Sequence, residues 1–236
     1  MRHRFQVRET VLTIVCEDRF LPVAKDAVFE ARAAIESKIA ADPFFGITYD
    51  PYPEDSRDDD LVRRMCRASV ASGVGPMAGV AGAVAVHVVE RMVSAGAEEA
   101  IVENGGDIAF YSRRPVPVGI YADDSVFRDI GFMVRSDSII GICSSSARIG
   151  PSVSLGSSDV CTVFSDDVIL ADCCATLLGN MVRGPDDLAR AVESVGSIEG
   201  VRGCVAVCSG KVAMFGDVPE IVPVDCSRCL GPGCEK

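Results

Sequence analysis

The stretch "PMAGVAGAVAVHVVERMVSAGAEEAIVENGGDIAF", Pro76 to Phe110, is the most informative about the fold, because two structural patterns follow one another within it. Small and apolar residues run to Gly96, which is typical of a buried helix that ends at a glycine. Short β-branched runs on either side of Asn104–Asp107 then predict two strands joined by a tight turn. The stretch therefore predicts a helix that leads directly into an antiparallel hairpin.

Outside this stretch, helical and strand patterns occur in blocks. Pro22–Asp42 has apolar residues at helical spacing, and a second apolar helix is expected after Phe164, capped by Ser165 or Asp166. Strands are expected at 11–15, 117–121, 132–135, 138–143 and 160–164, a surface loop at 48–60, and a hairpin turn at Ser209–Gly210. These blocks predict an α+β fold, an antiparallel-sheet-rich single domain with packed helices.

The composition restricts the class of protein. The 236 residues fit one domain, 1–225, and a short cysteine-containing tail, 226–236. A net charge of −11 argues against nucleic acid and anionic membranes as partners, because both need a basic face. We see no apolar run of the roughly 18 residues that span a membrane, and no signal peptide. We therefore expect a cytoplasmic protein whose cysteines are mostly small buried hydrophobes.

The turn Asn104-Gly105-Gly106-Asp107 has two interpretations. Asn, Gly and Asp tolerate positive φ, so the four residues are a good hairpin turn and nothing more. Alternatively, the two glycines leave a bare backbone that can lie against a ligand, with Asp107 at its rim. Turn propensity by itself favours the first interpretation.

The start of the apolar helix is rich in glycine and alanine, and we select Gly75, Ala78 and Gly79 as candidate binding residues. A glycine-rich loop before a helix leaves free N–H groups and a positive dipole end, which suit a phosphate. The segment lacks the lysine of a P-loop and the pattern of a dinucleotide fold. Close helix–sheet packing explains the small residues equally well.

Two further groups of polar residues are candidates for chemistry. Asp172 and Thr176 are four residues apart on the second apolar helix, so they share a face and can bind a hard cation such as Mg²⁺. Local capping or pairing of Asp172 is the simpler explanation of this spacing. The serine-rich segment 143–159 suits a polar ligand, or is a surface loop, and offers no nucleophile motif.

Taken in order, these groups are more specific than any one of them. The chain resembles the ApbE family, the FAD:protein FMN transferases, and within it the shorter branch grouped as UPF0280. The resemblance runs from about Phe20 to Gly216. Its strongest features are the glycine-rich helix that leads to "GGDI", the strand that ends in "GICSSS", and "SDVCTVFSDDVILADCCATLLGN".

The resemblance implies a flavin-nucleotide site in which FAD and Mg²⁺ are bound and FMN is joined to a threonine or serine of a target protein. By resemblance, Asp172, the Ala175 carbonyl and Thr176 would bind the metal. The flavin nucleotide would lie near the turn, the glycine-rich start and the serines, which are Gly75, Ala78, Gly79, Asn104, Gly105, Gly106, Asp107, Ser144, Ser145 and Ser146. Two family features are missing, a lysine in the glycine-rich segment and a His-Ile-Ile-Asp-Pro motif.

These departures leave several functions open. The chain could be a Mg²⁺-dependent FMN transferase or an FAD pyrophosphatase, a non-catalytic flavin or nucleotide binder, or an enzyme on another small phosphorylated substrate. Cys226, Cys229 and Cys234 in the tail could bind zinc or an iron–sulfur cluster only with a fourth ligand, and a reduced tail is the simpler interpretation. Hairpin edges often pair, so a homodimer is a further expectation.

Overall fold

The computed structural model describes residues 1–119, 129–146 and 156–224. The cysteine tail 226–236, with its predicted metal ligands Cys226, Cys229 and Cys234, lies outside the described residues, as does most of the serine-rich segment.

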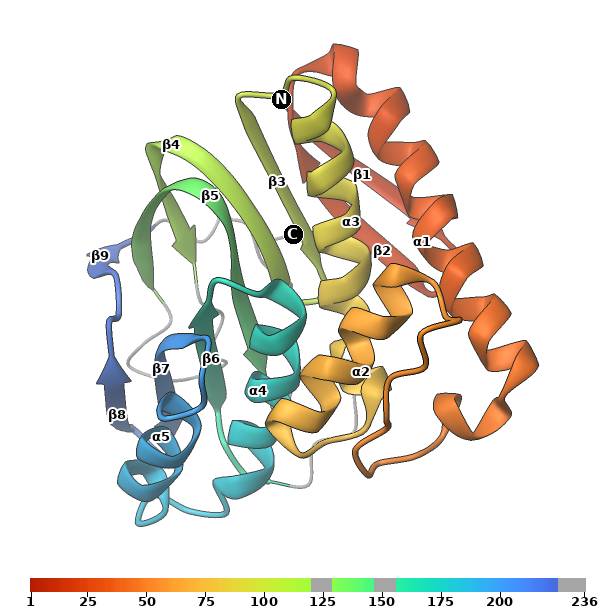
Figure 1. Cartoon of the computed structure of the whole chain (residues 1–236). Helices are drawn as coiled ribbons and strands as arrows, with labels where there is room; N and C mark the ends of the chain where they lie inside the picture. The colour runs from red at the N-terminus through yellow and green to blue at the C-terminus, as the bar shows by residue number, and fades with distance from the viewer. Residues whose placement is uncertain (120–128, 147–155, 225–236) are drawn as a thin grey trace.

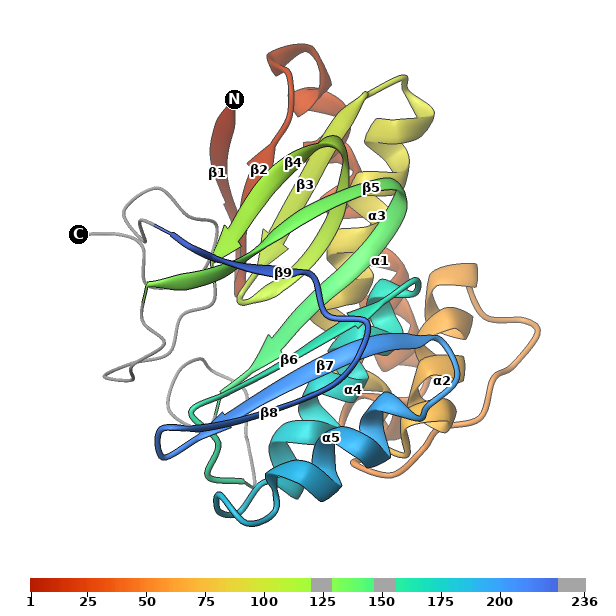
Figure 2. The same cartoon turned by 90° about the vertical axis from the view of Figure 1, so that its left-hand side faces the viewer.

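One β-sheet, with strands of different lengths, forms the centre of the molecule, and every strand pairing in it is antiparallel. Its order is β1-β2-β3-β4-β5-β6-β7-β8, and β9 pairs with β5. The strands are β1 (Arg2–Val7), β2 (Thr10–Val15), β3 (Glu99–Asn104), β4 (Asp107–Gly119), β5 (Ile130–Ser145), β6 (Val160–Ser165), β7 (Val201–Cys208), β8 (Lys211–Gly216) and β9 (Glu220–Pro223). Figure 2 shows how strongly this sheet curves along β4 and β5.

The helices gather on one side of the sheet (Figure 1). They are α1 (Leu21–Ala41), α2 (Asp60–Ser72), α3 (Val80–Ser94), α4 (Val168–Met181) and α5 (Leu188–Gly196), with short 3₁₀ turns η1 (Asp18–Phe20), η2 (Pro43–Gly46) and η3 (Pro76–Gly79). Helix α3 packs on β3 and β4, α4 on β5 and β6, and α5 on β7 and β8, while α1 and α2 pack against other helices. The predicted α+β fold is confirmed.

Local details differ from the predictions in three places. The expected short strands at 132–135 and 138–143 are parts of one long strand, β5, and β4 bends through register shifts between Phe110 and Val116 instead of ending there. The cap of α4 is Asp167, whose carboxylate accepts the N–H groups of Ile169 and Leu170 at 2.9 and 3.2 Å, and the predicted cap at Ser165 or Asp166 is wrong. The strand β1 and the helix α2 were not predicted.

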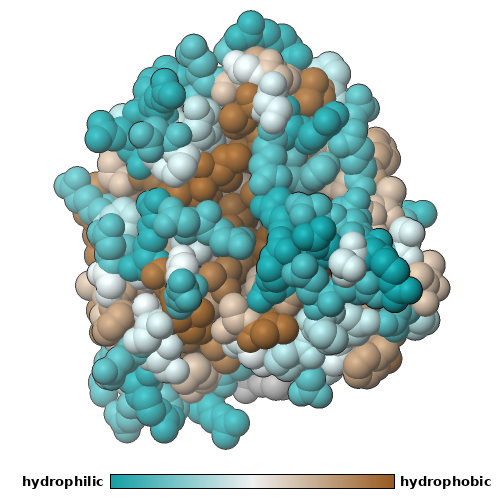
Figure 3. Space-filling model, in the orientation of Figure 1, coloured by the Kyte–Doolittle hydropathy of each residue, from teal (hydrophilic) through white to brown (hydrophobic). Residues whose placement is uncertain are grey.

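Both faces of the sheet are covered by apolar side chains. The larger core lies between the sheet and the helices, and a second core of residues such as Phe110, Phe132 and Phe164 fills the opposite face where the sheet curves. The rings of Phe132 and Phe164 meet edge to face at 4.8 Å. The outside seen in Figure 3 is largely hydrophilic, with hydrophobic residues exposed along a band down its middle.

The stretch from Pro76 to Phe110 forms a helix followed by a hairpin, as predicted. These are η3 and α3, followed by the β3–β4 hairpin. Contrary to the expectation that no segment is long enough, Pro76–Ser94 is long and apolar enough to cross a membrane, by length and composition only. In this fold α3 is a core helix, packed by α1, α4, β3 and β4. Its apolar character is therefore explained by burial inside the domain.

Candidate functional site

The turn between β3 and β4 is a two-residue hairpin closed by the pair Asn104 and Asp107. Gly105 and Gly106 have φ values of +68° and +111°, a backbone conformation that residues other than glycine rarely adopt. The Asn104 side-chain amide donates to the Ala81 carbonyl at 3.1 Å, so the turn is tied to the start of α3. The residues are thus a tight turn, and a Cβ on Gly105 would meet no heavy atom within 4 Å.

The first turn of α3 is capped from another helix. Its own cap position, Gly79, has no side chain to offer. Instead, the Asp172 carboxylate on α4 accepts the Gly82 backbone N–H at 2.7 Å. A Cβ on Gly82 would lie 2.9 Å from the Val168 carbonyl oxygen and 3.0 Å from the Asp172 Cβ, so only glycine allows this approach. A buried carboxylate at a helix N-terminus is also favoured by the helix dipole.

Asp172 and Asp107 form a buried pair of acids. The two side chains share a hydrogen bond, and each is less than a tenth exposed. Burial, followed by repulsion from Asp172, raises the pKa of Asp107 well above its usual range. Burial raises the pKa of Asp172 to about 7, against the opposing effect of the Gly82 N–H. The pair therefore shares a proton near neutral pH.

A thiol completes the surroundings of the acids. Cys143 on β5 pairs with Asp107 across the sheet, and its Sγ donates to the Val168 carbonyl at 3.6 Å. Burial and the neighbouring acids raise the pKa of this thiol far above its usual value, so it is a neutral hydrogen-bonding group and no nucleophile.

The predicted serines are divided between the two faces of β5 and the residue that follows it. Ser144 is anchored to the turn, because its N–H donates to the Gly106 carbonyl at 3.2 Å, but its hydroxyl pairs with Thr162 at 2.9 Å. Since side chains alternate along a strand, Ser144 lies on the opposite face from Cys143, while Ser145 shares the helix-covered face. The Ser146 hydroxyl donates to the Asp159 carbonyl at 2.8 Å.

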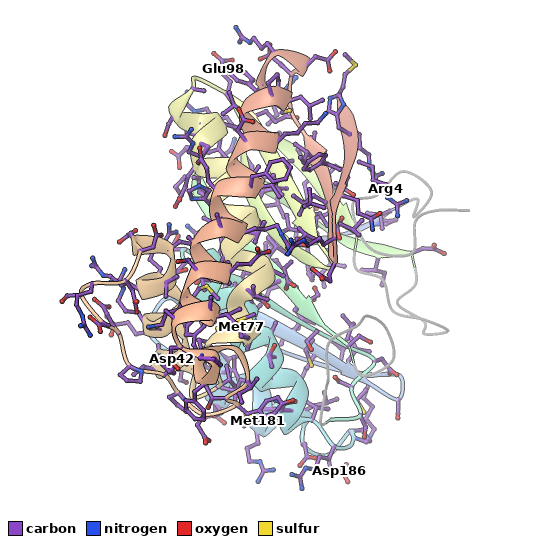
Figure 4. The ribbon with its side chains drawn as sticks, turned by 90° about the vertical axis from the view of Figure 1, so that its right-hand side faces the viewer. Arg4, Asp42, Met77, Glu98, Met181 and Asp186 are labelled. Carbon is purple, nitrogen blue, oxygen red and sulfur yellow. The ribbon has the colours of Figure 1, made fainter. Side chains whose placement is uncertain are left out.

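The predicted glycines of the helix start lie against protein atoms. A Cβ on Gly75 would be 2.0 Å from the Thr48 carbonyl oxygen, and one on Gly79 would be 2.8 Å from the Cys173 Sγ. Ala78 is partly buried against the main core. Close packing of η3 against α4 and the 48–60 segment thus explains the small residues, and their predicted role in ligand binding stays a prediction. Figure 4 shows Met77 on η3 and Met181 at the end of α4 in the same half of the molecule.

The predicted metal ligands lie on α4. Asp172 is buried, Ala175 is buried one turn later, and Thr176 is half-buried. No group of three or more histidine, cysteine, aspartate or glutamate side chains in the described ranges is arranged to hold a metal ion. The donors that are present are oxygens of two carboxylates and a hydroxyl, which are the type that Mg²⁺ prefers. A cation beside two buried acids would also relieve their repulsion, so the donor chemistry fits.

Two residues of this site, and one that supports its turn from the other face of the sheet, were not selected from the sequence. Gly82 belongs to the glycine-rich run, and its position three residues after Gly79 was the only indication in the sequence that it lies on the same face of the helix. Cys143 gave no signal, because its position opposite Asp107 depends on strand register. Glu103 is buried on the opposite sheet face, where its carboxylate accepts the Gly106 N–H at 3.0 Å and supports the turn.

Comparisons with known proteins agree with this fold. A family model described as AbpE bacteria matches residues 1–212. A UPF0280 protein from Methanocella arvoryzae is 44% identical, over 93% of this chain and 90% of its own length, and one from Archaeoglobus fulgidus is 40% identical over 93% and 94%.

Two solved structures share the fold. The apo flavinyl transferase ApbE of Pseudomonas stutzeri has a TM-score of 0.57 at 13% identity, covering 91% of this chain and 94% of that chain. The ApbE protein of Thermotoga maritima has a TM-score of 0.61 at 11% identity, covering 95% and 97%. By the family model, the UPF0280 relatives and the shared fold, this chain belongs to the ApbE-like family, in its UPF0280 branch.

Proposed function

We propose that this chain binds a flavin nucleotide with Mg²⁺ at the junction of the β3–β4 turn, the start of α3 and α4, and transfers FMN from FAD to a hydroxyl of a target protein. The observation that carries the proposal is the buried pair Asp107 and Asp172, held between the Gly-Gly turn and the Gly82 N–H. Family membership supports it, since the solved ApbE proteins of Pseudomonas stutzeri and Vibrio cholerae are described as flavin transferases.

Asp172 and Asp107 would hold the metal through carboxylate oxygens, and Thr176 and the Ala175 carbonyl are the further proposed ligands. When bound, Mg²⁺ would supply charge neutralisation of the FAD pyrophosphate. Both carboxyl groups must be ionised before they can hold a cation, so binding is expected to strengthen as pH rises through about 7, where Asp172 loses its proton, and further as Asp107 loses its own. The bare turn at Gly105 leaves room for a ligand beside the acids, while the Gly106 N–H is already donated to Glu103.

The reaction balances without a redox partner. The bond between the FMN phosphorus and the bridging oxygen of the pyrophosphate breaks, and a bond forms between the target hydroxyl oxygen and that phosphorus. AMP leaves with the bridging oxygen and the proton of the hydroxyl. This chain's residues bind and orient the two phosphates and exclude water from the buried acids.

A second function is favoured by a specific observation. The chain has no lysine in Gly75–Gly82 and no His-Ile-Ile-Asp-Pro motif, and Asp172 already serves α3 as a cap. We therefore propose flavin-nucleotide binding without transfer as the alternative, in which the acid pair binds the metal–nucleotide complex only. A cytoplasmic location stays a prediction.

One experiment separates these functions. The protein is incubated with FAD, Mg²⁺ and a threonine-containing peptide, while AMP, free FMN and flavin fluorescence of the peptide are measured. AMP with a labelled peptide indicates a transferase, AMP with free FMN indicates a pyrophosphatase, and FAD binding by calorimetry without products indicates the binder. Failure of FAD, FMN and ATP to bind would refute both proposals.

Variants locate the site. Asp172→Asn and Asp107→Asn are each expected to remove the Mg²⁺-dependent part of FAD affinity. Glu103→Gln is the matched control, because Glu103 is an equally buried acid of the same hairpin on the other face of the sheet. If Glu103→Gln lowers the affinity as much as Asp172→Asn does, the assignment of the site to the helix-covered face is wrong.

A further inference from the structure

The strand β8 forms the last edge of the sheet. The strand order ends at β8, and within the described part of the chain no strand pairs with its outer side. In Figure 2, β8 runs along the lower border of the sheet beside β7. An edge of this kind presents unpaired backbone groups to solvent and is a template for pairing with another strand.

The turn into β8 shows which backbone groups face β7. Ser209–Gly210 has φ values of +52° and +75°, the geometry of a two-residue hairpin turn, and Cys208 pairs directly with Lys211. Residues that close such a turn form a hydrogen-bonded pair, and every second pair of the ladder is of this type. At the far end, the Asp217 N–H donates to the Arg202 carbonyl at 2.8 Å, in agreement with this alternation.

The intervening residues of β8 therefore direct their backbone N–H and C=O groups outward. These residues are Val212, Met214 and Gly216. Since Gly216 ends the strand with φ of +76°, Val212 and Met214 are the regular part of this free edge.

The side chains of β8 are unusually apolar for an exposed edge. Val212 is 42% exposed and Met214 is 48% exposed, and Phe215 on the other face is 38% exposed. The opposite edge of the sheet, β1, instead carries the exposed charges of Arg2 and Arg4, a device that discourages self-pairing. Apart from Lys211 at its start, β8 carries no charge, and such an apolar edge is stabilised when another strand covers it.

We propose that β8 pairs antiparallel with β8 of a second copy of this chain, across a twofold axis at Met214. Only outward-facing residues can form the hydrogen-bonded pairs, and the register that uses all three of them pairs Met214 with Met214 and Val212 with Gly216. A shift of this register by one residue would place inward-facing groups opposite outward-facing ones.

The side chains fit this register. On the face away from the helices, Val212 meets Gly216, which has no side chain to oppose it. On the helix face, Ala213 lies opposite Phe215, so a small residue faces a large one. Beyond them, the Lys211 ammonium lies opposite the Asp217 carboxylate at both ends of the pair, which gives charge complementarity in this register and not in its neighbours.

The contact is expected to be modest in strength. One strand and its flanking side chains bury less than the roughly 800 Å² per partner of a standard interface, so a dissociation constant on the order of micromolar is expected. The dimer should therefore depend on concentration. It would join two sheets into one continuous sheet, and it is independent of any flavin function.

Sedimentation velocity of the full chain over a range of micromolar concentrations tests the proposal. Met214→Pro removes an outward N–H and leaves the β7 ladder intact, since proline is accepted on the solvent side of an edge strand. Met214→Lys places two like charges at the axis. Ile47→Lys is the matched control, because it adds the same charge to an exposed apolar residue away from β8. Circular dichroism confirms that each variant is folded.

The register has its own test. Lys211→Asp and Asp217→Lys should each weaken the dimer about tenfold or more, since each brings like charges together, and the double variant should restore it. The existing contact of Lys211 with Asp186, at 3.8 Å, is solvent-exposed and cannot reproduce that rescue. A monomer at all concentrations, or a dimer that Met214→Pro leaves unchanged, overturns the proposal. A dimer lost in Met214→Pro but not rescued by the double charge exchange overturns the register.

Discussion

Replacement of Gly82 by alanine tests the packing on which the candidate site depends. In a typical exposed helix this substitution stabilises the protein by about 1 kcal/mol, because alanine has the higher helix propensity. Here the opposite result is expected. The added methyl carbon would lie 2.9 Å from the Val168 carbonyl oxygen, 3.0 Å from the Asp172 Cβ and 3.2 Å from the Asp172 Oδ2.

The size of the effect follows from these contacts. Two of the three atoms belong to α4 backbone or to the first carbon of a side chain, so neither can rotate away and α3 must move from α4. Overpacking of this type costs about 1–3 kcal/mol, and a loosened hydrogen bond to a carboxylate about 1.5–3 kcal/mol. After the gain in propensity, we expect a net loss of about 3 kcal/mol, or about 6–12 °C in Tm for a domain of this size.

Differential scanning calorimetry measures the change, and calorimetric titration with FAD and Mg²⁺ measures its consequence for Asp172. Gly184→Ala is the matched control, because a Cβ there meets no atom within 4 Å and the backbone is not left-handed. The control should shift Tm by less than about 2 °C. A Gly82→Ala protein as stable as the wild type would refute the argument that close helix approach requires this glycine.

Three further outcomes are expected from the acid pair and the turn. The folded-state pKa of Asp172 is about 7, and its ordinary value is 3.8. Between these pH values the folded protein binds a proton that the unfolded chain does not. The free energy of unfolding therefore falls as pH rises from about 4 to about 7. Asp172→Asn lacks this titration and keeps an acceptor for the Gly82 N–H. Its Tm should therefore rise relative to that of the wild type as pH increases to 8. A Tm difference between the two proteins that does not change with pH would contradict the raised pKa. For the same reason Mg²⁺ should raise the Tm of the wild type more at pH 8 than at pH 5, and should have no such effect on Asp107→Asn. Asn104→Ala removes the hydrogen bond to the Ala81 carbonyl and should lower the free energy of unfolding by about 1 kcal/mol, or the Tm by about 2–4 °C. A fall in Tm no larger than that of Gly184→Ala would mean that this hydrogen bond does not anchor the turn.

The turns of the fold could be predicted from the sequence because they depend on the residues within them. The β3–β4 turn needs residues that tolerate positive φ, and the hairpin at Ser209–Gly210 likewise follows from turn chemistry. The long strand β5 was divided by prediction at Ser136–Asp137 and the long strand β4 at 112–116, because the polar residues and proline there are typical of a turn. In the structure the segment 112–116 bends within a continuous strand, since pairing with β5 and the second core hold it.

Roles that depend on contacts between distant segments were not readable in this way. The glycine-rich run signalled small residues, but not that Gly75 lies on the Thr48 carbonyl or that Gly82 lies on Asp172. The serines were selected as a group, and the pleat of β5 divides them between two faces. Cys143 was interpreted as a buried hydrophobe, and strand register places it beside the acids.

The α+β class, the Gly-Gly turn and the small-residue helix could be predicted from the residues alone, because backbone conformation depends on neighbouring residues. The raised pKa values of Asp107 and Asp172 required the folded structure, because a pKa depends on desolvation and on charges brought close by packing. The same distinction applies to β8: its apolar composition is local, whereas its exposure at the edge of the sheet is a property of the assembled fold.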